Sequence, residues 1–177
     1  MSSSGGIFVD SFSQFSPQLQ SFSSIFHLLQ FWEKRAPDAI AIEAPERMPL
    51  SYGRLNAAVC KIAGALESTG IGRGDRIGIV LPNGPDMAVA FLATAVTATA
   101  APLNHGYSKS ELEFYLSDVN AKGVITQEGI DGVARAAAEK LDIPVICLRS
   151  EAKMRRQEVI HCLTQSWHYS PNHRACL

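Results

Sequence analysis

Between residues 51 and 148, helical patterns alternate with short apolar runs, and this alternation limits the folds that the chain can adopt. The apolar runs have the length of strands and lie at 76–81, 99–103, 122–126 and 144–148. The helical patterns lie at 51–70, 86–96, 108–119 and 130–141. Such alternation is typical of parallel strands joined by crossover helices, and continuous apolar runs indicate strands that are buried on both faces. We therefore expect an α/β fold with a mostly parallel sheet.

The helical patterns carry start and stop signals. Ser51 is a suitable N-cap, and the helix behind it has one apolar stripe, made of Leu55, Val59, Ile62 and Leu66. Gly70 is predicted to end that helix, and Pro85 suits the first position of the next one. Ser108 and Glu111 have the spacing of a capping box. The helix behind them is expected to bury Leu112, Tyr115, Leu116 and Val119.

Composition divides the chain into three parts. Residues 1–24 are rich in Ser, Phe and Gln, and we expect a loosely ordered leader there. The alternative is a docking arm that uses Phe12, Phe15 and Phe22. Residues 25–148 hold the α/β pattern and are expected to form one partial subdomain. Residues 149–177 lose the alternation, and we expect an unrelated, disordered tail.

The subdomain is expected to open with elements that precede the alternating region. Residues 25–35 predict an amphipathic helix with an apolar face made of Ile25, Leu28, Leu29 and Trp32. Residues 39–44 alternate and predict a strand, and the chain is expected to return at Pro49 and Leu50.

Charge and cysteine usage indicate a cytoplasmic protein without a nucleic-acid or membrane partner. The formal net charge is −1, which gives no electrostatic reason to bind nucleic acid or an anionic membrane. The uncharged run 87–103 is shorter than the roughly 20 residues of a spanning helix, so we expect a buried helix followed by a strand. The four cysteines are scattered, which favours reduced thiols: Cys60, Cys147, Cys162 and Cys176. The amino terminus lacks the basic residues of a targeting segment, and no clear peroxisomal tripeptide ends the chain.

Three segments suggest a binding site, and for each a plainer interpretation is favoured. The glycines of 70–80 precede a strand, whereas those of a dinucleotide loop follow one, so we expect them to serve chain geometry. Residues 81–86 lie where a strand ends and a helix begins, a place that suits an anion, but a turn is the favoured interpretation. The tail holds five residues of types that bind zinc: His161, Cys162, His168, His173 and Cys176. Their irregular spacings do not fix a tetrahedral site, so a zinc site is not the favoured interpretation.

Three segments together resemble the amino-terminal part of the AMP-forming acyl-CoA synthetases. They are LSYGRLN (50–56), GIGRGDRIGIVLPNGPDMAVAFLATAV (70–96) and APLNHGYSKSELEFYLSDVNAKGVIT (101–126). Within that family, ATAAPLN and ELEFYLSD are most similar to the oxalate–CoA ligase branch, near the 4-coumarate–CoA ligase-like enzymes. The resemblance covers roughly residues 25–148. It implies a partial amino-terminal subdomain of the adenylate-forming ligase fold.

The resemblance also implies a chemistry of two half-reactions. A carboxylate attacks the α-phosphate of ATP to give an acyl-adenylate, and the thiol of CoA then takes the acyl group. In full-length relatives ATP, Mg²⁺ and CoA take part, and the charge on phosphate is neutralised by Mg²⁺, Lys and backbone N–H groups. The family motifs that supply these groups, among them a Ser/Thr-Gly-rich loop ending in Pro-Lys-Gly, do not occur in this sequence. We therefore assign no catalytic, cofactor-binding or metal residue and expect no cofactor in this chain.

The favoured hypothesis is a truncated acid–CoA ligase, acting on a short acid such as oxalate and inactive by itself. The tail after Leu148 suits a reading frame that runs into unrelated sequence. The alternatives are a stand-alone, non-catalytic binding or regulatory module and a small interaction protein with zinc in its tail. A partial sheet leaves apolar surface uncovered, so we expect self-association or chaperone binding.

Overall fold

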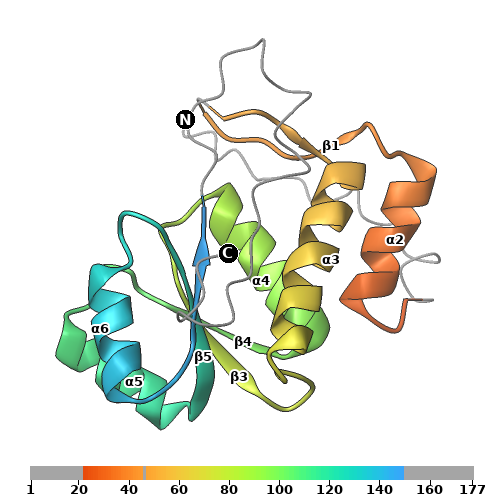
Figure 1. Ribbon diagram of the computed structural model, residues 1–177. Coiled ribbons are helices and arrows are strands. Elements are labelled where there is room, and N and C mark those ends of the chain that lie inside the picture. The colour runs from red at the N-terminus through yellow and green to blue at the C-terminus, as the bar shows by residue number, and fades with distance from the viewer. Residues whose placement is uncertain (1–21, 46, 150–177) are drawn as a thin grey trace, which may run out of the picture.

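The computed structural model describes residues 22–45 and 47–149. In these residues helices and strands alternate along the chain as the sequence predicts (Figure 1). The predictions for most of the leader and for the tail lie outside the described residues, and so do Phe12, Phe15 and the five zinc candidates.

The centre of the structure is a four-stranded parallel sheet with the strand order β4-β3-β5-β6. Its strands are β3 (Arg76–Val80), β4 (Thr99–Leu103), β5 (Ala121–Gln127) and β6 (Val145–Leu148). Ile79 of β3 lies between Pro102 of β4 and Ile125 of β5. The expectation of an α/β fold with a mostly parallel sheet is confirmed.

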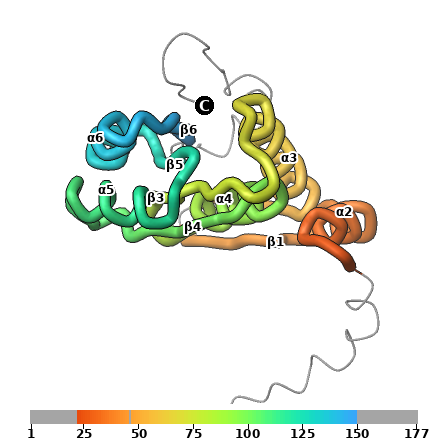
Figure 2. Tube along the Cα trace, turned by 90° about the horizontal axis from the view of Figure 1, so that it is seen from below, coloured from red at the N-terminus to blue at the C-terminus, as the bar shows by residue number. Residues whose placement is uncertain are grey.

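Helices cover both faces of the sheet (Figure 2). One face carries α2 (Ile25–Arg35), α3 (Tyr52–Ser68) and α4 (Pro85–Thr97). The other face carries α5 (Lys109–Asp118) and α6 (Gly132–Lys140). The run 87–103 is therefore divided between α4 and β4, as expected. No helix in the described part of the chain is long and apolar enough to cross a membrane.

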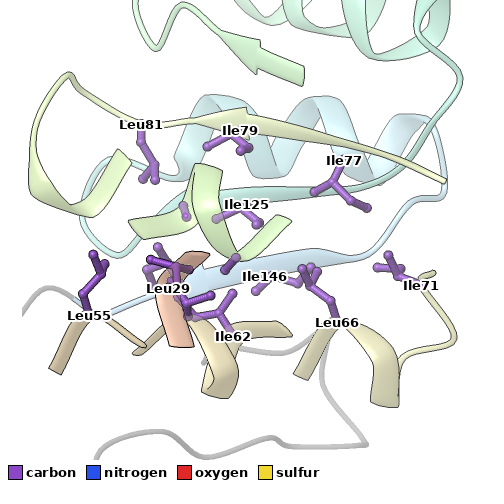
Figure 3. Packing of buried hydrophobic residues seen from close by; sticks show 14 residues of the cluster. Leu29, Leu55, Ile62, Leu66, Ile71, Ile77, Ile79, Leu81, Ile125 and Ile146 are labelled. Carbon is purple, nitrogen blue, oxygen red and sulfur yellow. The ribbon is translucent and has the colours of Figure 1, made fainter. Parts of the chain in front are cut away.

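Strands β3, β5 and β6 are buried on both sides because alternate side chains enter two separate hydrophobic clusters, whereas the edge strand β4 is half-buried to exposed. Ile77, Ile79 and Leu81 point into the cluster under α3 and α4, together with Ile125 and Ile146 (Figure 3). The predicted stripe of α3 lies in the same cluster, and its four members are at most 4% exposed: Leu55, Val59, Ile62 and Leu66. The second cluster lies under α5 and α6 and contains Val80, Leu112, Leu116, Val124 and Val145. Of the four residues predicted to be buried on α5, Leu112 and Leu116 are buried, whereas Tyr115 and Val119 are half-buried.

Gly78 lets α5 approach the sheet closely. A Cβ atom at this position would lie 2.4 Å from Cδ2 of Leu116, closer than van der Waals contact allows. Leu116 is only 1% exposed and has little room to move. The missing side chain on β3 therefore makes the space that the helix fills.

The residues predicted to begin and end helices form the expected capping hydrogen bonds. The Ser51 hydroxyl accepts a hydrogen bond from the Arg54 N–H. Gly70 has φ +81° and follows the end of α3, where the Ile71 N–H donates to the Leu66 carbonyl and the Gly70 N–H to the Glu67 carbonyl. This is the Schellman arrangement that glycine favours. Both hydrogen bonds of the Ser108–Glu111 capping box are present.

A small hairpin precedes the sheet. Its strands β1 (Ile40–Ile42) and β2 (Leu50–Ser51) pair antiparallel, which agrees with the predicted strand and return. The prediction for α2 is only partly right, because Leu29 is buried, Leu28 and Trp32 are half-buried and Ile25 is 36% exposed. Ile25 occupies the first turn, beyond the part of α2 that packs against its neighbours.

Candidate functional site

All strands of the four-stranded sheet are parallel, so the loops that follow β3, β4 and β5 gather at one edge. These loops lead into α4, α5 and α6. The carboxyl edge of an open parallel sheet is the usual place for a ligand. An anion could bind at this edge if the N-termini of these helices are not already occupied by negatively charged groups.

Each of these three helices begins with a carboxylate. Asp86 lies in the first turn of α4, Glu111 in the first turn of α5, and Asp131 is the N-cap of α6. A helix N-terminus carries a partial positive charge, which an acidic side chain there neutralises. The carboxyl edge therefore already holds negative charge and is poorly suited to a phosphate group.

The three carboxylates also have partners within the chain. Asp86 forms an ion pair with Arg47 of the hairpin at 2.7 Å. Glu111 accepts hydrogen bonds from the hydroxyl and the N–H of Ser108, and these bonds lower the pKa of Glu111. Burial raises the pKa of Asp131, but the hydrogen bonds and charge of Arg135, together with backbone hydrogen bonds, outweigh burial, and the net change in pKa is downward. All three groups therefore stabilise local structure.

The loop at 81–86, the candidate anion site, is a turn shaped by glycine. Gly84 has φ +156° and precedes α4 without a side-chain cap. Pro85 occupies the first position of the helix, where its missing N–H costs nothing. No Lys or Ser/Thr residue occurs between 81 and 86 to accompany the backbone N–H groups.

The glycines of 70–80 serve chain geometry, as the sequence suggests. Gly70 and Gly74 both have positive φ and turn the chain from α3 into β3. Between them the Gly72 N–H donates to the Asp75 carboxylate at 2.9 Å. These groups bond to one another and lie before the strand, at the opposite end from the carboxyl edge.

An open apolar hollow of about 590 Å³ lies beside the loop at 81–86. Its walls come from α2, the hairpin, α3, α4 and β4, and none of its lining residues is ionisable except Tyr52. They are Leu29, Ala41, Ile42, Tyr52, Leu55, Asn83, Gly84, Met87, Ala88, Phe91, Leu92 and Pro102. The hollow suits apolar atoms, with one polar side chain, Asn83, at the loop.

Several contacts fix the walls of the hollow. Tyr52 stacks on Trp32 of α2 with ring centroids 5.4 Å apart. The Asn56 amide on α3 donates to Glu33 of α2 at 2.6 Å. The Arg47–Asp86 pair joins the hairpin to α4. These contacts connect residues 20 to 39 positions apart, and no local sequence pattern could have revealed the hollow.

The elements that form the hollow also carry exposed large apolar side chains. Phe91 of α4 lines the hollow and is 40% exposed. Ile40 and Met48 belong to the hairpin that forms one wall, and they are 56% and 48% exposed. We call the hollow together with Ile40, Met48 and Phe91 the hollow face.

Residues 22–45 and 47–149 hold no cluster of metal-binding side chains. No group of three His, Cys, Asp or Glu side chains in this part of the chain is placed to hold a metal ion. Cys147 lies buried near Asp131, and Cys60 carries a thiol whose pKa is raised by burial and then by the charge of Glu33. The raised pKa of Cys60 is opposite to the lowered pKa of a nucleophilic thiol.

Residues 29–172 match the protein family described as AMP-binding enzyme. This match runs past residue 148, whereas the segments quoted for the resemblance end at 126. The chain is 37% identical to an oxalate–CoA ligase of Arabidopsis thaliana over 118 residues, which are 66% of this chain and 23% of that protein. It is 43% identical to a probable CoA ligase, CCL9, of Humulus lupulus, over 60% of this chain and 20% of that protein. The chain thus spans less than a quarter of these relatives.

Two solved structures share the fold of this chain. Apo MatB from Rhodopseudomonas palustris is 27% identical, with a TM-score of 0.62, and the match covers 71% of this chain and 25% of that one. A benzoate CoA ligase from Burkholderia xenovorans LB400 is 19% identical, with a TM-score of 0.65, over 72% of this chain and 26% of that one. The second likeness is one of fold alone.

Proposed function

Because the chain belongs to the AMP-binding enzyme family, we propose that it forms the amino-terminal α/β part of a cytoplasmic acid–CoA ligase. The match over residues 29–172 carries this proposal. The ligase would convert a short carboxylic acid to an acyl-adenylate and then to its CoA thioester. Oxalate is the acid that we propose first, because an oxalate–CoA ligase is 37% identical over 118 residues.

The described residues do not fit ATP or Mg²⁺. The three helix N-termini at the carboxyl edge hold Asp86, Glu111 and Asp131, whose charges oppose a polyphosphate. No cluster of three metal-binding side chains occurs in the described part of the chain. We therefore propose that these residues take no part in the chemical steps and that this part of the ligase supports its fold.

The first test of this proposal is ATP–pyrophosphate exchange by the 177-residue chain. We expect no exchange above a heat-inactivated control with oxalate or other short acids. Removing one donor to a developing negative charge typically slows a reaction about 10²–10³-fold, and no described residue supplies such a donor. Acid-dependent exchange would show that the chain carries a phosphate site of its own.

The second test is a chimera. Residues 25–148 replace the matched segment in the oxalate–CoA ligase of Arabidopsis. If this part is a ligase scaffold, the chimera forms oxalyl-CoA. A control chimera with Leu66→Asp, which places a charge in the core, should be inactive. A chimera that folds but forms no thioester would contradict the proposal.

A stand-alone, non-catalytic module is a second candidate function. One observation favours it: helices cover both faces of the sheet within the described residues, and each face has its own hydrophobic cluster. Such a module would fold alone as a stable monomer, and the solution mass of the chain separates the two candidates.

A further inference from the structure

We propose that Asn83 is a site of spontaneous deamidation, at which the side-chain amide is lost and the residue becomes aspartate or isoaspartate. Asn83 lies in the loop at 81–86, between β3 and α4, and it lines the hollow. The reaction needs only water as a second reactant, so this modification is independent of the proposed ligase activity.

The residue that follows Asn83 favours this reaction. In deamidation, the backbone nitrogen of the next residue bonds to Cγ of the asparagine, loses its proton and expels the side-chain nitrogen as ammonia, which closes a succinimide ring. One water molecule then opens the ring at either carbonyl and leaves aspartate or isoaspartate. Glycine favours ring closure because no Cβ crowds its nitrogen and its backbone adopts conformations that other residues avoid. Of the asparagines in this sequence, Asn83 alone precedes a glycine.

The structure leaves both reacting groups accessible. Asn83 and Gly84 are exposed. Within the described part of the chain, no hydrogen bond holds the Asn83 amide, and the Gly84 N–H donates none. Gly84 is the N-cap of α4 and its carbonyl accepts the Ala88 N–H, so the helix holds the carbonyl of Gly84 while its nitrogen lies in the loop. The Asn83 side chain can therefore turn toward that nitrogen without breaking a hydrogen bond.

The other asparagines among the described residues are less suited to the reaction. Asn56 is 6% exposed, and its amide donates to Glu33 at 2.6 Å. The Asn104 side chain accepts the Gly106 N–H at 2.9 Å. Asn120 directly precedes β5 and, like Asn56 and Asn104, is followed by a residue with a Cβ. These three residues are internal controls for Asn83.

Asp131 gives a further comparison, because it also precedes a glycine, Gly132. An Asp-Gly pair can close the same ring, but its carboxyl group must be protonated and then lose water. The Asp131 carboxylate accepts two hydrogen bonds from Arg135, at 2.9 and 2.6 Å, which stabilise its ionised form. We therefore expect Asp131 to react more slowly than Asn83 in the folded chain.

Deamidation changes the charge of the hollow. Position 83 gains a carboxylate beside the N-terminus of α4, where Asp86 already pairs with Arg47 at 2.7 Å. Isoaspartate also adds one carbon to the backbone before Gly84 and so lengthens the loop. A charge beside apolar lining such as Met87 disfavours an apolar occupant, because burial of an unpaired charge is costly. The age of the chain therefore affects what the hollow can bind.

The experiment follows deamidation in the folded 177-residue chain. The chain is kept at neutral and at mildly alkaline pH, and samples are digested and analysed by mass spectrometry for replacement of NH2 by OH at each asparagine. A protein isoaspartyl methyltransferase with labelled S-adenosylmethionine detects isoaspartate in the separated peptides. Asn83→Gln keeps an amide but needs a larger ring, and Gly84→Ala adds a Cβ beside the attacking nitrogen. Thermal midpoints show whether both variants fold, and the chain in urea gives the rates without structure.

We expect the folded chain to lose the Asn83 amide before the other described asparagines react, and faster at the higher pH, because the attacking nitrogen must lose its proton. Asn83→Gln should lose the isoaspartate signal of this peptide, and Gly84→Ala should slow its appearance. Reaction of Asn104 or Asn120 ahead of Asn83, or equal rates at Asn83 and Asp131, would overturn the inference. So would reaction of Asn83 in urea alone, because the folded loop would then protect it.

Discussion

At the scale of single residues, Gly78 shows how one missing side chain sets the spacing between a helix and the sheet. Gly78→Ala should destabilise the fold by about 1–3 kcal/mol, because a Cβ there would lie 2.4 Å from a buried Leu116 atom. The matched control is Gly64→Ala in α3, where a Cβ meets nothing within 4 Å. That control should stabilise by about 0.5–1 kcal/mol through helix propensity. Urea midpoints of the two variants should therefore move in opposite directions, and a shared direction would contradict the packing at Gly78.

A second residue-scale prediction concerns acid stability. The pKa of Asp131 is lower in the folded chain because the hydrogen bonds and charge of Arg135, together with backbone hydrogen bonds, outweigh the upward effect of burial. A lowered folded pKa stabilises the fold above the unfolded value of about 3.9, and this contribution disappears as pH falls through the folded pKa. Asp131→Asn should therefore lower the thermal midpoint at neutral pH and have less effect near pH 2. An equal loss at both pH values would exclude the carboxylate charge as the cause.

At the scale of elements, the sequence predicts both the buried apolar face of α3 and the C-terminal end of this helix at Gly70. Leu66 is fully buried and its carbonyl accepts the Ile71 N–H at the end of the helix. Leu66→Ala should cost about 2–5 kcal/mol, whereas Glu67→Ala on the exposed side of the helix should change little. Denaturant unfolding of both variants tests this, and an unchanged midpoint for Leu66→Ala would remove α3 from the core.

The elements also show what sequence patterns can and cannot predict. The strands were predictable because a parallel sheet buries both faces, which makes runs such as GIVL and VICL continuously apolar. Helix ends were predictable where a local signal exists, as at Ser108, Glu111 and Gly70. The strand order and the hollow were not, because the order depends on pairing between distant strands and the hollow on contacts such as Arg47–Asp86, whose partners lie 39 residues apart. The exposure of Ile25 has the same origin, because periodicity identifies the apolar face of a helix but not how much of that face a neighbouring element covers.

At the scale of the whole molecule, we predict that the hollow face makes the isolated chain associate. Helices cover both faces of the sheet within the described residues, and exposed large apolar side chains remain on the hollow face and at Phe114, Ile130 and Val133. We expect the hollow face to drive association because its apolar side chains surround a concave surface. Light scattering at tens of micromolar should give a mass above that of a monomer, rising with concentration, and Phe91→Glu should reduce it. A sharp monomeric peak with a cooperative thermal transition would favour the stand-alone module.

The stacking of Trp32 on Tyr52 gives the hollow an optical reporter. Tyr52 lines the hollow and its ring lies 5.4 Å from that of Trp32, so any occupant that excludes water from Tyr52 also changes the surroundings of the indole. The sequence contains one other tryptophan, Trp167, and Trp167→Phe leaves Trp32 as the single emitter. Its emission should move to shorter wavelength as the chain associates at rising concentration, and Phe91→Glu should leave the emission wavelength unchanged over the same concentrations.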